Sequence, residues 1–424
     1  MTLTVDPDLF SSFMEKISDF GSTSDGGLNR EAGTTDHGLA RDWFFGQLRD
    51  RGYQIRIDEI GNVFAVLEAN AREDTPVIMV GSHLDSQPFG GRFDGAYGVI
   101  AAFAAVEALR AEAEASGAPP SCSFVIVDWM NEEGARFQPS LLGSSVYCGE
   151  LGLNYALTRC DGAGLTVGDE LERTGYRGKD AAPRADIYIE LHVEGNDELE
   201  KTNLQIGPFA RYWGALKIRA AMHGETAHTG PTLMRDRRDA TLAAAHAIVG
   251  TREISDRRDG ALYSSCGRLV IQPNSPNMVA DLATMFLELR SPDPDDLHAA
   301  EVELMEVLRE SAAKVGVTHE VISIDRREAG AFDPRLVALC ERQAEALGLG
   351  TMQLETIGGH DAVPVSRKMP GIVIAIPSVG GVIHHPTEYS KPEDLMNGAN
   401  VLAGMIHAIA QAGGDLDRTL GDNA

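Results

Sequence analysis

The sequence predicts an α/β protein, in which a mostly parallel sheet carries helices on both faces and an α+β domain is inserted. Three observations predict this class. Short apolar runs alternate with long helical patterns through the first half of the chain. Near Gly207 the pattern changes to longer strands with two amphipathic helices, and from about residue 327 the first pattern returns. We therefore expect one domain at 1–209 and 327–424 and an inserted domain at 210–326.

The individual elements follow from apolar spacing, with three- and four-residue repeats for helices and short apolar runs for strands. The first part predicts helices at 39–51 and 95–115, short strands at 54–58 and 63–67, and buried strands at 76–81, 123–128 and 186–193. The insert predicts strands at 211–221, 264–271 and 283–290, and helices at 235–250 and 295–314. The last part predicts helices at 334–347 and 392–410 around a strand at 372–376. With both helices of the insert on one face, a free sheet edge could serve dimerisation.

Chain length indicates the number of domains, and net charge indicates which partners to expect. A chain of 424 residues is long for one core, so two domains are expected. Its 37 Lys and Arg against 63 Asp and Glu give a net charge of −26. Such a surface repels nucleic acid and anionic membranes, so neither is an expected partner. A local arginine or metal can still attract a small anionic substrate.

The cysteines and the first residues predict a cytoplasmic protein. The five cysteines are an odd number without C-x-x-C spacing, which favours free thiols in a reducing compartment. The first residues lack the basic and apolar segments of a signal peptide. The apolar run at 96–106 is far shorter than the roughly 20 residues that a membrane span needs.

The segment GSHLDSQPFGGRFDG, residues 81–95, contains the first candidate site residues. His83 follows a predicted buried strand, and ligand sites of open α/β sheets lie at the carboxyl ends of strands. Asp85 can accept a hydrogen bond from the free ring nitrogen of a metal-bound His83. Asp94 lies among glycines that let the backbone turn tightly and present a carboxylate to a metal. One such His or Asp alone is better explained as a solvated loop residue.

Three further segments also follow predicted strands. Glu132 and Glu133 follow the second buried strand, where one carboxylate can bind a metal and the other can transfer protons. For this pair alone, an acidic helix N-terminus is the better explanation. His192 lies near the end of the third strand and His384 follows the last one; each alone is more often a satisfied polar residue. Four candidate sites at strand ends of one sheet favour a metal site, and these donors suit zinc, manganese, cobalt or nickel.

The insert adds three polar residues of a type that binds anions. His228 follows a predicted strand, Asn277 lies in a turn and Arg290 ends a strand. Each could hold an oxyanion or a carboxylate. Each also has a simpler explanation, as a surface histidine, a turn asparagine or an arginine at a strand edge.

Six segments together resemble blocks of the M20 metallopeptidase superfamily, specifically its N-carbamoyl-L-amino-acid hydrolase, β-ureidopropionase and allantoate amidohydrolase branch. In chain order they are GSHLDSQPFGGRFDGAYGV, DWMNEEGARF, ELHVE, HGETAHTGPTLMRDRRDA, GGHDA and IHHPTEYS. The resemblance runs from about Gly33 to Ala410. His192, where peptidase branches carry an acidic ligand, points to the carbamoylase and ureidohydrolase branch.

The resemblance implies a catalytic domain with two bridged divalent metal ions, and a lid and dimerisation domain in the insert. It implies that Glu132 is the general base and that Asp85 orients His83. Five ligands are implied, with Asp94 shared between the ions: His83, Asp94 and His192 for one, and Asp94, Glu133 and His384 for the other.

The same resemblance implies how the substrate is held. His228 would reach the active site of the partner subunit in a homodimer and stabilise the oxyanion. Asn277 and Arg290 would bind the substrate, with the arginine pairing to its carboxylate. The remaining pocket residues would be Gly358, Gly359 and His360.

The expected function is metal-dependent hydrolysis of a linear amide or ureido C–N bond. An N-carbamoyl-L-amino acid or related ureido acid is the expected substrate, giving an amino acid, ammonia and carbon dioxide. The alternatives are an N-acyl-amino-acid deacylase or dipeptidase of the same superfamily, and a non-enzymatic binding protein on this scaffold. Two departures bear on the substrate: Gly195 stands where relatives usually have Gln, and Ile357 is bulkier than the usual small residue.

Overall fold

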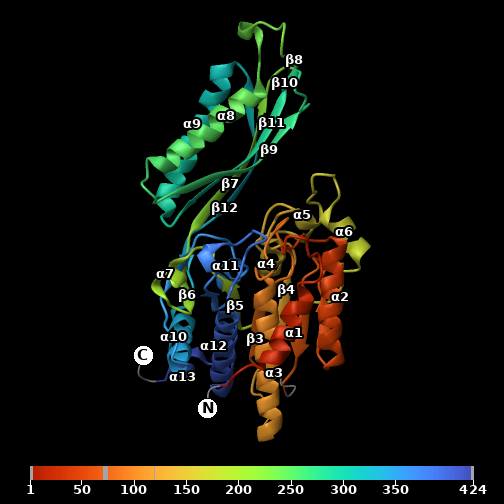
Figure 1. The fold of residues 1–424 in the computed structure, drawn as a ribbon, viewed down its shortest axis with the longest axis vertical. Coiled ribbons are helices and arrows are strands. Elements are labelled where there is room, and N and C mark those ends of the chain that lie inside the picture. The colour runs from red at the N-terminus through yellow and green to blue at the C-terminus, as the bar shows by residue number, and fades with distance from the viewer. Residues whose placement is uncertain (1–2, 70–74, 119, 422–424) are drawn as a thin grey trace. The chain divides into compact units, whose positions relative to one another are not determined.

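The computed structural model describes residues 3–69, 75–118 and 120–421, and the chain forms two compact units (Figure 1). Unit 1 comprises Met1–Ala210, Phe332–Leu354 and Gly358–Ala424. Unit 2 comprises Arg211–Ala331 together with Glu355–Ile357. Unit 2 is thus inserted into the chain of unit 1.

The centre of unit 1 is a sheet with strand order β1-β2-β4-β3-β5-β15-β6. The four middle strands, β4, β3, β5 and β15, run parallel, and β1, β2 and β6 pair antiparallel at the edges. The expected mostly parallel sheet is confirmed. Its strands are β1 (Gln54–Ile57), β2 (Val63–Leu67), β3 (Val77–His83), β4 (Ser123–Trp129), β5 (Ile187–Val193), β6 (Gly207–Tyr212) and β15 (Gly371–Ile376), with short β14 (Leu354–Thr356) beside β6.

Alternation along the strands puts helices on both faces of this sheet. Along β5, Ile189 and Leu191 enter the core beneath α3 (Ala96–Ser116). Tyr188 and Glu190 point to the other face, where Trp129 packs against Tyr188 and α11 begins at the amide that Glu190 binds. The other helices of unit 1 are α1 (Pro7–Ile17), α2 (Thr35–Asp50), α4 (Leu142–Cys148), α5 (Leu153–Leu157), α6 (Val167–Thr174), α7 (Glu198–Thr202), α10 (Pro334–Ala346), α11 (Ala362–Ser366), α12 (Pro392–Gln411) and α13 (Leu416–Leu420).

Unit 2 is an antiparallel sheet of order β12-β7-β11-β9 with two long helices packed on it. Their shared core is aliphatic and alanine-rich, and both helices have an aspartate cap, Asp239 and Asp293, whose carboxylate accepts from first-turn amides. The elements are β7 (Gly214–His223), β8 (Ala227–His228), α8 (Ala240–Asp256), β9 (Tyr263–Gln272), β10 (Met278–Val279), β11 (Leu282–Ser291), α9 (Pro294–Val315), β12 (Thr318–Arg327) and β13 (Gly330–Ala331).

Two expected elements of the insert begin elsewhere. The helix expected from residue 235 begins at Ala240, because Asp239 caps it and the chain before it is a single 3₁₀ turn. The strand expected at 211–221 is split at Trp213, whose amide donates to Thr356, so its first part belongs to β6 and the rest to β7. Among the described residues, no helix is both long and apolar enough to cross a membrane.

Candidate functional site

Three of the parallel strands of unit 1 bring the predicted site residues to one edge of the sheet. His83 is the last residue of β3, and His192 is the last but one of β5. Glu132 and Glu133 follow the end of β4 at Trp129. Because neighbouring parallel strands end at the same edge, side chains far apart in the sequence meet there.

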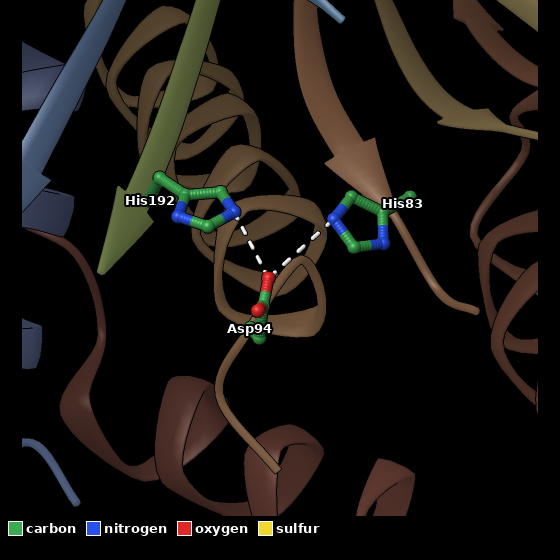
Figure 2. Close-up of side chains that lie close together, drawn as sticks. All are labelled: His83, Asp94 and His192. Carbon is green, nitrogen blue, oxygen red and sulfur yellow. Dashed lines mark ion pairs between the residues drawn. The ribbon is translucent and has the colours of Figure 1, made fainter. Parts of the chain in front are cut away.

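The first cluster contains His83, Asp94 and His192, and all three side chains are buried (Figure 2). One ligand atom from each lies within 4.8 Å of the other two. The Nε2 atom of His192 is 3.0 Å from Oδ1 of Asp94, and Nε2 of His83 is 3.6 Å from the same oxygen. Figure 2 shows both rings pointing at this carboxylate from two strands.

The second cluster uses the other oxygen of Asp94. The Nε2 atom of His384 lies 3.1 Å from Oδ2 of Asp94 and 3.3 Å from Oε2 of Glu133. Again one ligand atom from each residue lies within 4.8 Å of the others. The two clusters therefore share Asp94, one at each carboxylate oxygen.

Main-chain carbonyl oxygens lie beside one ring nitrogen of His83 and of His192 and so favour one tautomer of each ring. Nδ1 of His83 lies 2.9 Å from the carbonyl oxygen of Asp85, and Nδ1 of His192 lies 2.9 Å from that of Val193. If Nδ1 carries the proton in each ring, Nε2 presents a lone pair to the cluster, as a metal ligand requires. Within the described residues Nε2 of His83 has no hydrogen-bond partner, although it is fully buried. The donor set therefore fits divalent metal ions such as zinc or manganese.

The carboxylates of the two clusters raise the pKa of the neighbouring histidines. Burial lowers the pKa of His192, but the Asp94 carboxylate outweighs this and raises that pKa to about 9. The His384 side chain is 47% exposed, so burial opposes its protonation only in part, and its contacts with Asp94 and Glu133 raise its pKa to about 11. The carboxylates thus attract positive charge, whether a proton or a metal ion supplies it.

Glu132 lies beside the first cluster without belonging to either ligand group. Its side chain is buried, and Oε2 is 3.5 Å from Nε2 of His83. Burial, followed by the nearby carboxylates of Asp361 and Glu133, raises the pKa of Glu132 well above its ordinary value. A buried carboxyl with a raised pKa is suited to accept and return a proton.

Asp85 contacts His83 differently from the expectation. Its carboxylate oxygen Oδ1 is 3.7 Å from Nδ1 of His83, whereas its own main-chain carbonyl is 2.9 Å away. The two carboxylate oxygens instead accept from the backbone amides of Glu132 and Glu133, each at 3.3 Å. Asp85 thus fixes the loop after β4, and its main chain orients the histidine.

His360, one of the predicted pocket residues of unit 1, lies beside the first cluster. The ring of His360 is 4.6 Å from that of His192, edge to face, and is stacked on Phe209 at 5.6 Å. Gly358 and Gly359 come directly before His360 in the chain.

The other three predicted residues belong to unit 2, where they lie at two ends of β11. His228 pairs in β8 with Met278, the residue after Asn277, so these two lie together. Leu282, at the start of β11, pairs with His223, whereas Arg290 pairs with Ala215 at the other end. Eight residues of strand separate the ends by roughly 26 Å. The Arg290 guanidinium pairs with Glu288 at 2.8 Å and also donates to the Ile357 carbonyl.

Sequence reasoning missed two residues that contact members of the clusters. The side-chain amide of Gln87 donates to Oε2 of Glu133 at 2.8 Å, and its backbone amide donates to Oε1 at 3.1 Å. Glu388, in the segment of His384, accepts from the backbone amides of Phe93 and Asp94. Both residues lie in the segments that we singled out, but no local pattern distinguishes them from surface residues.

Comparison with known proteins places this chain in a family. The model of peptidase family M20/M25/M40 matches residues 79–408. A putative hydrolase of Mycolicibacterium smegmatis is 39% identical, over 95% of this chain and 92% of its own. An N-carbamoyl-L-amino-acid amidohydrolase of Rhizobium meliloti is 32% identical, over 95% of each chain.

A solved structure agrees with the sequence comparisons. An amidase of the hydantoinase/carbamoylase family from Burkholderia vietnamiensis superposes with a TM-score of 0.92 at 30% identity, covering 96% of this chain and 98% of that one. The structural match shows the fold, and the family and relatives show the enzyme class. The protein is a hydrolase that acts on linear amides. By its family match along most of its length, the chain belongs to peptidase family M20/M25/M40.

Proposed function

We propose that this hydrolase uses two divalent metal ions to cleave the C–N bond of an N-carbamoyl-L-amino acid or a related ureido acid. One observation carries the proposal: two three-residue ligand groups share the carboxylate of Asp94, beside the buried carboxyl of Glu132. His83 and His192 would complete one metal site, and Glu133 and His384 the other. A shared carboxylate between adjacent ligand groups is the arrangement of two-metal hydrolases.

The metal ions, when bound, would polarise the scissile carbonyl and lower the pKa of the attacking water. Glu132 takes one proton from that water and returns it to the leaving nitrogen, which its raised pKa favours. His228 donates to the developing oxyanion, and loss of such a donor typically costs about 10²–10³ in rate. Arg290 exchanges Glu288 for the carboxylate of the substrate and so sets its orientation.

The proposed substrate class rests on the name of a relative and on one proposed metal ligand, His192. The Rhizobium meliloti relative is named as acting on N-carbamoyl-L-amino acids. His192 supplies nitrogen where peptidase branches carry a carboxylate, as the sequence indicated. One water converts the carbamoyl amino acid to the free amino acid, ammonia and carbon dioxide, because the carbamate released decomposes.

Zinc fits both ligand groups, and manganese, cobalt and nickel accept the same nitrogen and oxygen donors. We also propose a homodimer in which unit 2 acts as lid and dimerisation domain. The roughly 26 Å between the two ends of β11 supports it. A small substrate cannot contact both Arg290 and His228 of one chain, so His228 would come from the partner subunit. All five cysteines are free thiols, which fits the cytoplasmic location expected from the sequence.

The test is a substrate panel on protein loaded separately with Zn²⁺, Mn²⁺, Co²⁺ and Ni²⁺. It contains N-carbamoyl-L-amino acids, their D-enantiomers, N-carbamoyl-β-alanine, allantoate, N-acetyl-L-amino acids and dipeptides. Ammonia and free amine are measured separately, because a carbamoyl or ureido substrate releases ammonia and an acyl substrate does not. Equal ammonia and amine from an N-carbamoyl-L-amino acid, abolished by chelation, is expected. Turnover confined to acetyl or peptide substrates, or unaffected by chelators, would overturn the proposal.

A further inference from the structure

Glu388 is a buried carboxylate that contacts the main chain on both sides of the shared ligand. One oxygen, Oε1, accepts from the backbone amide of Phe93 at 2.8 Å and from that of Asp94 at 3.0 Å. The side chain is only 4% exposed. Among the described residues, the other oxygen, Oε2, has no hydrogen-bond partner. We predicted no role for Glu388 from the sequence.

We propose that Glu388 is the positioning residue for Asp94: it fixes the backbone so that each Asp94 oxygen faces one ligand group. This rests on the proposed function, because it takes Asp94 as the shared metal ligand. The hydrogen bonds can be tested separately from metal binding, because they join Glu388 to backbone amides.

The Asp94 loop is shaped around this carboxylate. A Cβ atom at Gly91 would lie 2.0 Å from the carboxyl carbon of Glu388 and 2.2 and 2.3 Å from its oxygens. Any other residue at position 91 would therefore displace the carboxylate. Gly91 lies three residues before Asp94. The glycine and Glu388 together therefore determine the backbone path that leads to Asp94.

The start of α3 makes this contact favourable. The helix has 21 residues and its cap is Gly95, which has no side chain to accept from the nearby amides. The carboxylate of Glu388 accepts from the two amides just before the cap, where the helix dipole favours a negative charge. That attraction offsets part of the cost of burying Glu388 beside a second carboxylate.

One short segment thus acts on Asp94 twice. His384 reaches Oδ2 of Asp94 at 3.1 Å, and four residues later Glu388 binds the backbone amide of Asp94 at 3.0 Å. A turn joins the two, because the amide of Glu388 donates to the carbonyl of His385 at 3.0 Å. Side chain and main chain of the shared ligand are therefore held by the same segment.

The test compares Glu388→Ala and Gly91→Ala with Glu388→Gln, whose side-chain carbonyl can still accept from both amides. The control is Asp186→Ala, because Asp186 accepts from the backbone amide of Val77 at 2.9 Å, where β3 begins, at the opposite edge of the sheet. Two readouts are used: hydrogen exchange of the Phe93 and Asp94 amides in chelator-treated protein, and Co²⁺ affinity with the visible spectrum of the bound ion.

Glu388→Ala and Gly91→Ala should each speed exchange at these two amides and weaken Co²⁺ binding by about 10–100-fold. Glu388→Gln should retain most of the affinity, and Asp186→Ala should bind Co²⁺ as wild type does. Wild-type exchange and wild-type Co²⁺ affinity in Glu388→Ala would overturn the inference. If Glu388→Ala does not fold, equal Co²⁺ affinity in Gly91→Ala and wild type would do the same. A wild-type protein that binds no Co²⁺ would instead refute the proposed function, while amide exchange would still test the contact.

Discussion

The proposed trans role of His228 in a homodimer makes a quantitative prediction for mixed dimers. A heterodimer with Glu132→Gln in one subunit and His228→Ala in the other has one active site that lacks both groups. Its second site has an intact Glu132 and receives His228 from the partner subunit. Such dimers should therefore show about half of the wild-type turnover per dimer, because one of two equivalent sites is complete.

The parent homodimers set the baseline. Loss of a general base typically costs about 10²–10⁴ in rate, and loss of an oxyanion donor about 10²–10³. Recovery to about half of wild type is therefore a gain of roughly 50-fold or more over either parent. Two affinity tags and sequential purification isolate the heterodimer, light scattering verifies its mass, and ammonia release from the best panel substrate measures turnover.

Arg290 provides a matched control. Its guanidinium donates to the carbonyl of Ile357, which also belongs to unit 2. The proposed function takes Arg290 from the same subunit as Glu132. A heterodimer of Glu132→Gln and Arg290→Ala would then have no complete site and should stay near the parents. Mixed Glu132→Gln and His228→Ala dimers no more active than their parents, or a monomeric active enzyme, would refute the trans assignment.

Two further predictions separate the roles of neighbouring site residues. Glu132→Gln should keep both metal ions by elemental analysis yet lose about 10²–10⁴ in kcat, which is roughly 3–5 kcal/mol of activation free energy; near-wild-type kcat with full metal content would remove it from proton transfer. His192→Ala and His384→Ala should each reduce the metal content from two ions to one, because each ligand serves one cluster; unchanged metal content in either variant would count against that ligand.

The sequence singled out the residues that form the two clusters, because their positions depend on local features. His83 and His192 come at the ends of buried strands, and parallel strands end together whatever the rest of the chain does. The Asp94 loop is marked by its glycines. The strands and helices that we predicted in unit 1 match the structure to within a few residues, since apolar spacing is strong in a buried sheet. The helices α1, α6 and the shorter helices of unit 1 were not predicted.

The contacts around the two clusters could not be predicted from local patterns. Glu388 and Phe93 are 295 positions apart, and no spacing rule relates them. The side-chain amide of Gln87 also looks like an ordinary loop residue until the fold brings Glu133 to it. In unit 2, the register of strand pairing places Arg290 and His228 at opposite ends of β11. This register cannot be predicted from the apolar pattern of the sequence.

The charges buried at the site give an independent argument for divalent cations. Asp85, Asp94, Glu132 and Glu388 are all buried at this edge of the sheet. Arg41 is also buried, but it pairs with Asp128 at 2.6 Å. Burial raises the pKa of Asp85 and of Glu388 to about 7, so ionising the whole cluster without cations is costly. Two divalent ions would bring four positive charges to the point where these carboxylates converge, which offsets the cost of burying them.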